Sequence, residues 1–477
     1  MSLLWESDAL LQAMKGRPVG VLPAGITGVS IDTRTLKPGD AFFAIRGDQH
    51  DGHDFTSAAM KAGASVLVVA ESKLPALGRL VAPMIVVPDV LAALEDLGRA
   101  ARARSKAKIV AVTGSVGKTT TKEALRHVLS SVGTVHASDK SFNNHWGVPL
   151  TLARLPADAD FGVFEIGMNH PDEIRPLVKM VRPHVAIVTL IAPAHLGHFD
   201  SLEAIARAKA EIFEGIEPGG CALINRDDPQ AKLLAGLARA AGVKHVANFG
   251  EQERAQVRLL SCDLYPDHSF ISVGINGNVL DVRVGAPGRH IVQNVLAVLG
   301  AAALVGADME RVGAALSTLA PESGRGRRHR LAVGGGVITL IDESYNANPA
   351  SMTAALELLR ATPPENGGRR IAVLGDMLEL GEHANRLHAA LAGPIGESGA
   401  EIVLLAGTAM KALDETLPES LPHDHRASAD ELKPILLETV RGGDVIMVKS
   451  SNGIGFSRLV KAMLERFPAA ASGEISG

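Results

Sequence analysis

The stretch AVTGSVGKTTTKE, Ala111–Glu123, constrains the fold of this chain more than any other segment. It overlaps the end of an apolar run, AKIVAVT, that predicts a β-strand, and it leads into TTTKEALRHVL, which predicts a helix. Backbone N–H groups at the start of a helix bind anions, and the helix dipole adds to the attraction. Gly114 and Gly117 permit positive φ angles and a close approach of the backbone to a phosphate. The segment therefore predicts a strand–turn–helix phosphate site in an α/β domain.

The side chains of this turn favour ATP or GTP as the ligand. Lys118 is placed to reach the β- and γ-phosphates, and the hydroxyl of Thr119 to hold Mg²⁺. Val112 occupies the place of the first glycine in the full G-x-x-x-x-G-K-[ST] spacing, so the pattern G-x-x-G-K-T remains. The strings D-x-x-G and N-K-x-D, expected of a switch GTPase, do not occur in the chain, which disfavours that class.

Length and composition limit the class of protein. At 477 residues the chain is too long for one ordinary core, so roughly two to four domains are expected. A formal net charge of −4 gives no reason to expect a nucleic-acid partner, which would need a concentrated basic face. The 2 cysteines cannot build a disulfide framework.

The N-terminus and the apolar runs give no sign of targeting or of a membrane span. MSLLWESDAL lacks a basic region and carries Glu6 and Asp8, unlike a secretory signal. The longest apolar run, Val295–Ala307, is too short to cross a bilayer and predicts a buried helix. We therefore expect a cytoplasmic protein.

Three sections with different patterns predict three α/β domains, at residues 1–106, 107–322 and 323–477. The first has short apolar strands broken by Gly, Pro and Asp. In the second, strands alternate with helical stretches, which is typical of a parallel sheet with crossover helices. The third predicts another doubly wound, Rossmann-like sheet. PESGRGRRHR, at 321–330, predicts an interdomain linker from which Arg325 could reach a nucleotide phosphate.

Four stretches of the middle section contain candidate site residues. SFNNHWGVPLTL, Ser141–Leu152, carries paired amides. Glu165 lies near the end of an apolar strand, where an unpaired carboxylate is costly to bury, so a metal or a cation is expected nearby. APAHLGHFDS contains His195 and follows a strand at the sheet edge where α/β proteins bind ligands. The helix predicted after it carries Lys209 among alanines.

This combination resembles the Mur ligase family, ATP-dependent amide-forming enzymes of peptidoglycan synthesis. The family's marks are T-G-x-x-G-K-T, N-N-x-x-G-x-P, a strand-borne Glu, an A-H motif and a later lysine, and all occur here in this order. IDTRTLKPGDAFFAIRGDQHDGHDF near the start, IDESYNANPASM and VLGDMLELGEHANRLH are most similar to the members that join D-Ala-D-Ala to UDP-MurNAc-tripeptide. Two positions depart from the pattern: Glu343 stands where Asp is common, and KSS at Lys449–Ser451 replaces Lys-Gly-Ser.

The resemblance implies a role for each matching residue. ATP contacts fall on Thr113, Gly114, Ser115, Gly117, Lys118, Thr119, Thr120, Asn294, Arg325 and Asn346. Substrate contacts fall on Thr33, Arg34, Gly47, His53, Asn143, Asn144 and Asn348. The catalytic group comprises Lys118, Glu165, His195 and Lys209, and Thr119, Glu165, His195 and Lys209 are the implied Mg²⁺ partners. In relatives the lysine at this last position is carbamylated by CO₂, which replaces a repelling ammonium by an anionic oxygen ligand.

The reaction implied is transfer of the γ-phosphate of ATP to the free carboxylate of UDP-MurNAc-tripeptide, followed by attack of the D-Ala-D-Ala amine on the acyl phosphate. We expect a monomer that needs ATP and Mg²⁺. Three alternatives are a Mur ligase that adds the third, diamino acid residue, a folylpolyglutamate-type ligase, and a regulatory protein that hydrolyses ATP without ligation. Simpler roles also stay open: Lys209 as a solvated helix lysine, His195 as a loop histidine, and YNANP and DGHD as turns.

Overall fold

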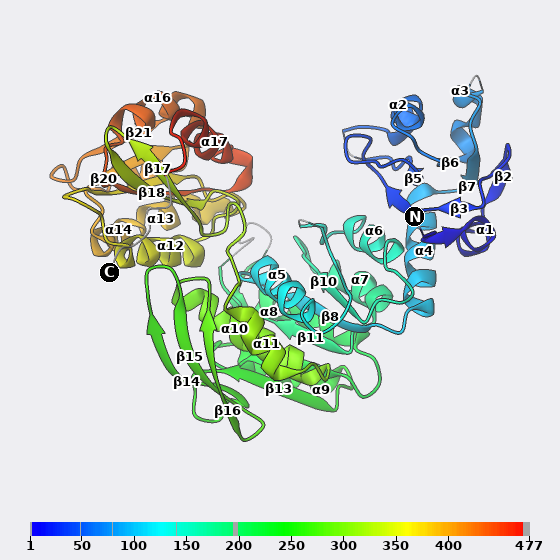
Figure 1. The fold of residues 1–477 in the computed structure, drawn as a ribbon, viewed down its shortest axis with the longest axis horizontal. Helices are drawn as coiled ribbons and strands as arrows, with labels where there is room; N and C mark the ends of the chain where they lie inside the picture. The colour runs from blue at the N-terminus through cyan, green and yellow to red at the C-terminus, as the bar shows by residue number, and fades with distance from the viewer. Residues whose placement is uncertain (1, 48, 79, 140, 194–198, 471–477) are drawn as a thin grey trace.

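Three α/β parts follow one another along the chain in the computed structural model, which describes residues 2–47, 49–78, 80–139, 141–193 and 199–470 (Figure 1). Each part is built on its own main β-sheet. The three-domain α/β architecture expected from the sequence is thereby confirmed.

The N-terminal sheet has the strand order β2-β7-β6-β5-β4, with β4 to β7 parallel and β2 antiparallel at the edge. Its apolar runs form the central strands, as predicted, and Asp89 caps the following helix α4 by accepting a hydrogen bond from Ala92 N at 2.7 Å. The elements are β1 Trp5–Glu6, α1 Ser7–Met14, β2 Arg17–Val19, β3 Gly25–Ile26, β4 Gly28–Ser30, β5 Asp40–Phe43, α2 Thr56–Lys61, β6 Val66–Ala70, α3 Leu74–Leu77, β7 Met84–Val87 and α4 Val90–Arg104.

The central sheet has the order β16-β15-β14-β13-β12-β11-β8-β10-β9 and is parallel from β9 to β14. Strands β14 to β16 extend it as antiparallel hairpins, which the sequence pattern did not reveal. The strands are β8 Lys108–Thr113, β9 Val135–Ala137, β10 Phe161–Glu165, β11 Val185–Val188, β12 Cys221–Asn225, β13 His245–Gly250, β14 Val257–Leu264, β15 Ser269–Ile275 and β16 Asn278–Val284. The helices are α5 Lys118–Leu129, α6 Gly147–Ala153, α7 Ile174–Val181, α8 Leu202–Ala210, α9 Ala231–Ala240, α10 Arg289–Leu304 and α11 Met309–Leu316.

The C-terminal sheet has the order β17-β18-β22-β19-β20-β21 and is parallel except for β17. Its strands are β17 Arg327–Val333, β18 Gly336–Glu343, β19 Arg370–Gly375, β20 Ile402–Ala406, β21 His423–Arg426 and β22 Val445–Lys449. Its helices are α12 Pro349–Ala361, α13 Ala384–Ala389, α14 Ala392–Ser398, α15 Lys411–Asp414, α16 Ala429–Thr439 and α17 Ser457–Arg466.

The predicted linker at 321–330 is only half right. Residues 327–330 belong to β17, which pairs along its whole length with β18, so the connection between the sheets ends at Gly326. The arginine-rich run predicts a solvated linker from its charge. In an antiparallel edge strand such as β17, however, alternate side chains can face solvent while the backbone pairs with the neighbouring strand.

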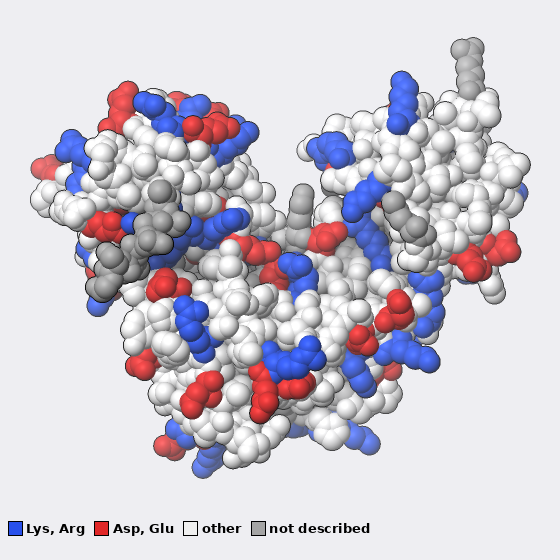
Figure 2. All heavy atoms as spheres, in the orientation of Figure 1, with Lys and Arg blue, Asp and Glu red and all other residues white. Residues whose placement is uncertain are grey.

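One hydrophobic core continues through the N-terminal and central parts, and each of these parts also has a further core of its own. The C-terminal part has two separate cores. Trp5 fastens the first two parts: its indole Nε1 donates to Ala153 O at 2.9 Å, and the Arg104 guanidinium lies 3.4 Å from its ring centroid. The N- and C-terminal parts lie on the same side of the central part in Figure 1. Figure 2 shows the surface hollowed between them, with acidic and basic side chains interspersed.

None of the helices that the structure describes is both long and apolar enough to cross a bilayer.

Candidate active site

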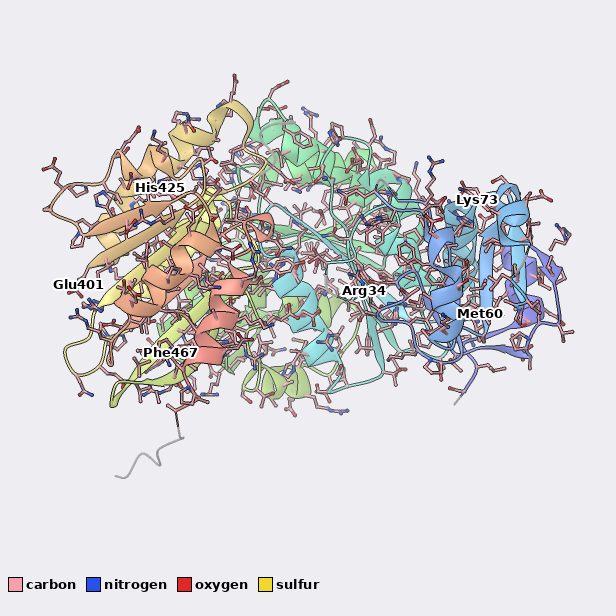
Figure 3. All side chains as sticks on the ribbon, turned by 90° about the horizontal axis from the view of Figure 1, so that it is seen from above. Arg34, Met60, Lys73, Glu401, His425 and Phe467 are labelled. Atoms are coloured by element: carbon pink, nitrogen blue, oxygen red, sulfur yellow. The ribbon has the colours of Figure 1, made fainter. Side chains whose placement is uncertain are left out.

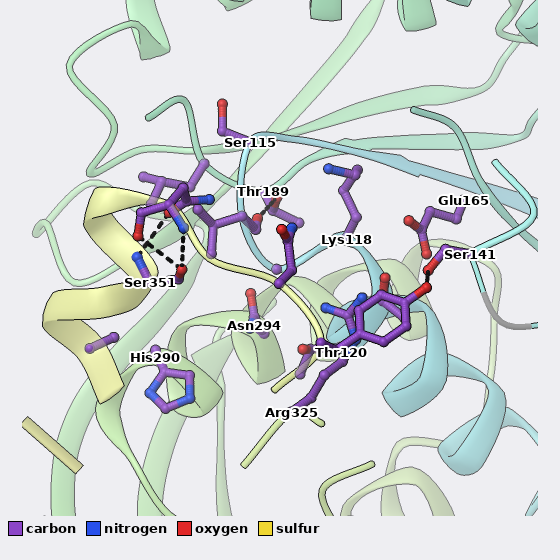
Figure 4. Close-up of a pocket in the computed structure, with 18 of the residues that line it drawn as sticks. Ser115, Lys118, Thr120, Ser141, Glu165, Thr189, His290, Asn294, Arg325 and Ser351 are labelled. Carbon is purple, nitrogen blue, oxygen red and sulfur yellow. Dashed lines mark hydrogen bonds between the residues drawn. The ribbon is translucent and has the colours of Figure 1, made fainter. Parts of the chain in front are cut away.

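A cavity of about 560 Å³ lies between the central and C-terminal parts (Figure 4). Its walls are formed by the phosphate loop, the carboxyl ends of the central strands, helix α10 and the turns that precede α12 and follow β19. The predicted residues in these walls are Ser115, Gly117, Lys118, Thr119, Thr120, Asn143, Glu165, Asn294, Arg325, Asn346 and Asn348. Sequence motifs about 230 residues apart therefore meet in one cavity.

The phosphate loop has the close-packed backbone that its glycines predict. Gly117 has a φ angle of 86°, and a Cβ atom there would stand 2.4 Å from Oδ1 of Asn294, so only glycine fits without a shift. The Lys118 ammonium donates to Gly114 O at 2.7 Å, and the Thr189 hydroxyl donates to a loop carbonyl at 2.5 Å. Lys118 is thus folded back over the loop, at the place where phosphate oxygens are bound in such turns.

Lys118 lies in an electrostatically mixed environment. Burial lowers the pKa of its ammonium, and the nearby carboxylate of Glu165 opposes that shift. Arg325 and Glu379, which both come from beyond the central sheet, also act on it, the first lowering and the second raising its pKa. Groups from the C-terminal part therefore reach the phosphate loop.

Glu165 is buried at the end of β10, with 1% of its surface exposed. The Asn143 amide donates to Oε1 at 2.7 Å, whereas Oε2 has no hydrogen-bond partner among the residues the structure describes. A buried carboxylate oxygen left in this way is costly unless a cation binds it. The donor set fits the expected Mg²⁺, which prefers carboxylate, hydroxyl and phosphate oxygens.

Lys209 is not the solvated helix lysine of the simpler interpretation, since it is 1% exposed on α8. Its Nζ has no hydrogen-bond partner within the described part of the chain. Burial, and then repulsion by Lys118, lower the pKa of the Lys209 ammonium well below its usual value. His195, the predicted partner of Lys209, lies in 194–198, outside the described residues.

The C-terminal part contributes a cluster of contacts to the opposite wall. Tyr345 donates from its hydroxyl to Ser141 Oγ at 2.9 Å, and the Arg325 guanidinium lies 4.4 Å from its ring centroid. Lys449 links two residues of this wall: its Nζ lies 3.2 Å from a Glu343 carboxylate oxygen and 3.0 Å from Asn346 O. The glutamate that departs from the family pattern is therefore held in an ion pair.

Two of the predicted amides have clear structural roles. Asn348 caps α12 by accepting from Ser351 N at 2.9 Å, and the Ser351 hydroxyl accepts in return from Asn348 N at 3.0 Å. Asn144 Oδ1 accepts from Gly147 N at 2.9 Å at the start of α6. Asn348 also lines the cavity, so it serves the helix and borders the site at once.

The residues predicted to bind the UDP-sugar lie on the N-terminal part, and none of them is in the cavity wall. Arg34 is 86% exposed, pairs with Asp32 at 2.7 Å, and lies on the side of its domain nearest the other parts (Figure 3). Thr33 is its neighbour in the same turn, and Gly47 is exposed. His53 is buried, with Nδ1 2.6 Å from an Asp51 carboxylate oxygen and Nε2 accepting from a backbone N–H.

Several cavity residues were not predicted. Thr189 and His290 carry only weak sequence signals, a threonine ending a strand and a histidine four residues before Asn294. Glu379 lies in VLGDMLELGEHANRLH, which carries only the family resemblance, and Tyr345 lies in YNANP, which also predicts a turn. A signal for Glu379 existed in the chemistry, since a carboxylate lies there between apolar residues of a loop after a strand.

The fold and this cavity define a multidomain phosphate-loop protein of the nucleotide-dependent ligase class. Family models match three segments: the Mur ligase family catalytic domain at residues 25–102, the Mur ligase middle domain at 112–302, and the Mur ligase glutamate ligase domain at 326–452. The chain belongs to the Mur ligase family.

The similar proteins extend over almost the whole chain. Relatives from Rickettsia prowazekii (strain Madrid E) and Escherichia coli (strain K12), both named UDP-N-acetylmuramoyl-tripeptide–D-alanyl-D-alanine ligase, are each 32% identical. The matches cover 91% and 92% of this chain and 94% of each relative. A crystal structure of MurF from Acinetobacter baumannii has a TM-score of 0.82 and 28% identity, with 97% of this chain and 99% of that chain covered.

Proposed function

We propose that this chain is an ATP-dependent ligase that joins D-Ala-D-Ala to UDP-MurNAc-tripeptide, giving UDP-MurNAc-pentapeptide, ADP and phosphate for peptidoglycan synthesis. The observation that carries the proposal is the cavity in which the phosphate loop, the buried Glu165 and groups of the C-terminal part meet. Relatives that carry this name match over nearly their full length. The three domains, 1–106, 107–322 and 323–477, would bind the UDP-sugar, ATP and the incoming dipeptide, respectively.

ATP would lie along the cavity with its phosphates on the loop. Backbone N–H groups of the loop and the Lys118 ammonium neutralise the triphosphate, and Arg325 adds positive charge from the C-terminal side. Asn294 borders the loop at Gly117 and would contact the nucleotide from α10. This arrangement lets an anionic carboxylate approach an anionic phosphate, which would repel each other in water.

Thr119, Glu165 and a carbamylated Lys209 would hold Mg²⁺, with His195 as a further partner. When bound, the ion supplies positive charge to the phosphate oxygens. The lowered pKa of Lys209 favours its neutral amine, the form that can add CO₂ to give a carbamate and release one proton. Labelling with ¹³CO₂ should give a carbamate resonance that a Lys209→Arg variant lacks.

Product analysis tests the proposed function. Phosphate release should require ATP, UDP-MurNAc-tripeptide and D-Ala-D-Ala together, and mass spectrometry should detect the pentapeptide. Lys118→Ala should lose turnover while staying folded. Equal phosphate release without D-Ala-D-Ala would favour the regulatory hydrolase, and incorporation of a free diamino acid or of glutamate onto folate would favour the other ligases. A monomeric state and a cytoplasmic location stay predictions.

A further inference from the structure

The incoming amine of a dipeptide is largely protonated at neutral pH, and only its neutral form can attack a carbonyl carbon. Resting on the proposed function, we propose that Glu379 binds the ammonium group of D-Ala-D-Ala and takes its proton. The site would accept a primary ammonium on a zwitterionic D-amino acid or dipeptide.

Glu379 is an exposed residue in the cavity wall, on the loop that follows β19. The same cavity contains Lys118 and Glu165, which mark the end where the phosphate is transferred. The carboxylate of Glu379 also acts on Lys118, because it opposes the lowering of the pKa that burial imposes on this ammonium. Glu379 therefore lines the same cavity as the groups at the reacting end and lies near enough to Lys118 to act on its charge, on the domain that would deliver the dipeptide.

The loop holds Glu379 in a conformation that favours glycine, with a φ angle of 64°. The residues just before it are fixed to other elements: Met377 N donates to His388 Nε2 at 2.9 Å, and Leu378 N donates to Ser451 Oγ at 3.0 Å. Left-handed backbone at a non-glycine residue persists where the surroundings determine it, and such positions cluster at functional sites. The carboxylate is thus presented by a constrained loop.

Among the residues the structure describes, the other carboxylates of the cavity wall are less exposed than Glu379. Glu165 is buried and bonded to Asn143. Asp227 accepts backbone N–H groups of the turn after β13, at 2.7 and 3.2 Å. Glu343 is paired with Lys449. Glu379 is the carboxylate whose exposure lets an entering cation reach it.

The ammonium group of the dipeptide loses two protons as the amide bond forms. The R–NH₃⁺ group gives one proton to the Glu379 carboxylate, and the freed amine attacks the acyl carbon. The C–N bond forms as the C–O bond to phosphate breaks, and the leaving phosphate takes the bonding electron pair and the second amine proton. Glu379 returns its proton to solvent.

The test compares Glu379→Gln with Glu382→Gln, a control on the same loop whose carboxylate is 89% exposed and outside the cavity wall. Three readouts are taken: tripeptide-dependent exchange of label between ADP and ATP, pentapeptide formation, and hydroxamate formation with hydroxylamine, a nucleophile that is neutral at pH 7. Glu379→Gln should lower kcat/KM for D-Ala-D-Ala by about 100-fold at pH 7 while exchange and hydroxamate formation stay within about threefold of wild type. The loss of kcat/KM in Glu379→Gln should become smaller above about pH 8, because the amine of D-Ala-D-Ala is then already deprotonated in solution.

Each other outcome overturns a distinct claim. Wild-type kinetics of Glu379→Gln with D-Ala-D-Ala, or an equal loss with both nucleophiles, overturns the amine role of Glu379. A wild-type protein that shows no tripeptide-dependent exchange overturns the proposed function instead.

Discussion

Glu165 keeps one carboxylate oxygen on Asn143 and the other without a hydrogen-bond partner in the described ranges. Glu165→Gln retains the volume and the bond from Asn143, so the free energy of unfolding should change by less than about 1 kcal/mol. Because the negative charge is lost, turnover should fall by about 100-fold and the Mg²⁺ concentration for half-maximal activity should rise. Activity measured against Mg²⁺ concentration checks this, and an unchanged Mg²⁺ dependence would remove Glu165 from the metal site.

Lys209 should destabilise the protein when no metal or CO₂ is present. Burial lowers the pKa of its ammonium in the folded state, so below the unfolded pKa the unfolded chain binds more protons and is favoured as the pH falls. Lys209→Met should raise the free energy of unfolding by about 1 kcal/mol at pH 7 in CO₂-free, Mg²⁺-free buffer. The gain should shrink as the pH rises toward about 10.

Denaturant unfolding at pH 7 and at pH 9.5 measures this gain, and Lys461→Met is the control, because Lys461 is 76% exposed on α17. If the gain in the free energy of unfolding does not depend on pH, the pKa of Lys209 in the folded protein is not lowered.

At the scale of elements, the capping box of α12 separates two roles of Asn348. Its side chain accepts from Ser351 N, so Asn348→Ala should cost about 1 kcal/mol, whereas Asn348→Ser should restore most of that cost. Hydrogen exchange in the first turn of α12 reports the cap, and the KM for D-Ala-D-Ala reports the predicted substrate contact. If the serine variant restores the helix but not the KM, Asn348 contacts substrate; recovery of both would leave it a cap alone.

The elements that the sequence predicted best are those with local signals. The strand–turn–helix around Gly117 needs only its glycines, its apolar strand and its helical periodicity, and it is present as expected. The pattern does not predict the hairpins β14 to β16, because antiparallel edge strands can mix polar and apolar residues and these strands take their register from one another. The arginine run 327–330 was assigned to a linker because its charge masks the pairing with β18.

The site shows the same limit. Residue type and position in a strand or turn are enough to predict Lys118 and Glu165 as site residues. Tyr345 and Glu379 did not, because their importance comes from contacts between domains, and no local pattern encodes which loop of one sheet will face another. The resemblance to the Mur ligase family indicates which distant stretches belong to one site, and local patterns in a single sequence do not.

At the scale of the whole molecule, one hydrophobic core continues through the first two parts, whereas the two cores of the third part lie within it. The joint between β1, α4 and α6 is fastened by Trp5, which donates to a backbone carbonyl of α6 and stacks under Arg104. At the cavity, the Tyr345 hydroxyl of the C-terminal part makes a polar contact with Ser141 of the central part. Domain motion should therefore be carried mainly by the C-terminal part, because polar interfaces between domains separate more readily than a continuous apolar core.

This motion should protect the acyl phosphate from water, and the hydroxyl of Tyr345 should help to hold the closed state. Tyr345→Phe removes the bond to Ser141 but keeps the ring beneath Arg325, so ATP binding should be nearly unchanged. Because the domains then separate more often, water should hydrolyse part of the acyl phosphate. The ratio of phosphate released to pentapeptide formed should therefore rise by roughly twofold or more, which corresponds to the loss of a hydrogen bond worth about 1 kcal/mol. Tyr265→Phe is the matched control, since the chain has 2 tyrosines and Tyr265 is exposed at the β14–β15 turn. Ratios near one in both variants would show that the hydroxyl of Tyr345 does not hold the domains together during the reaction.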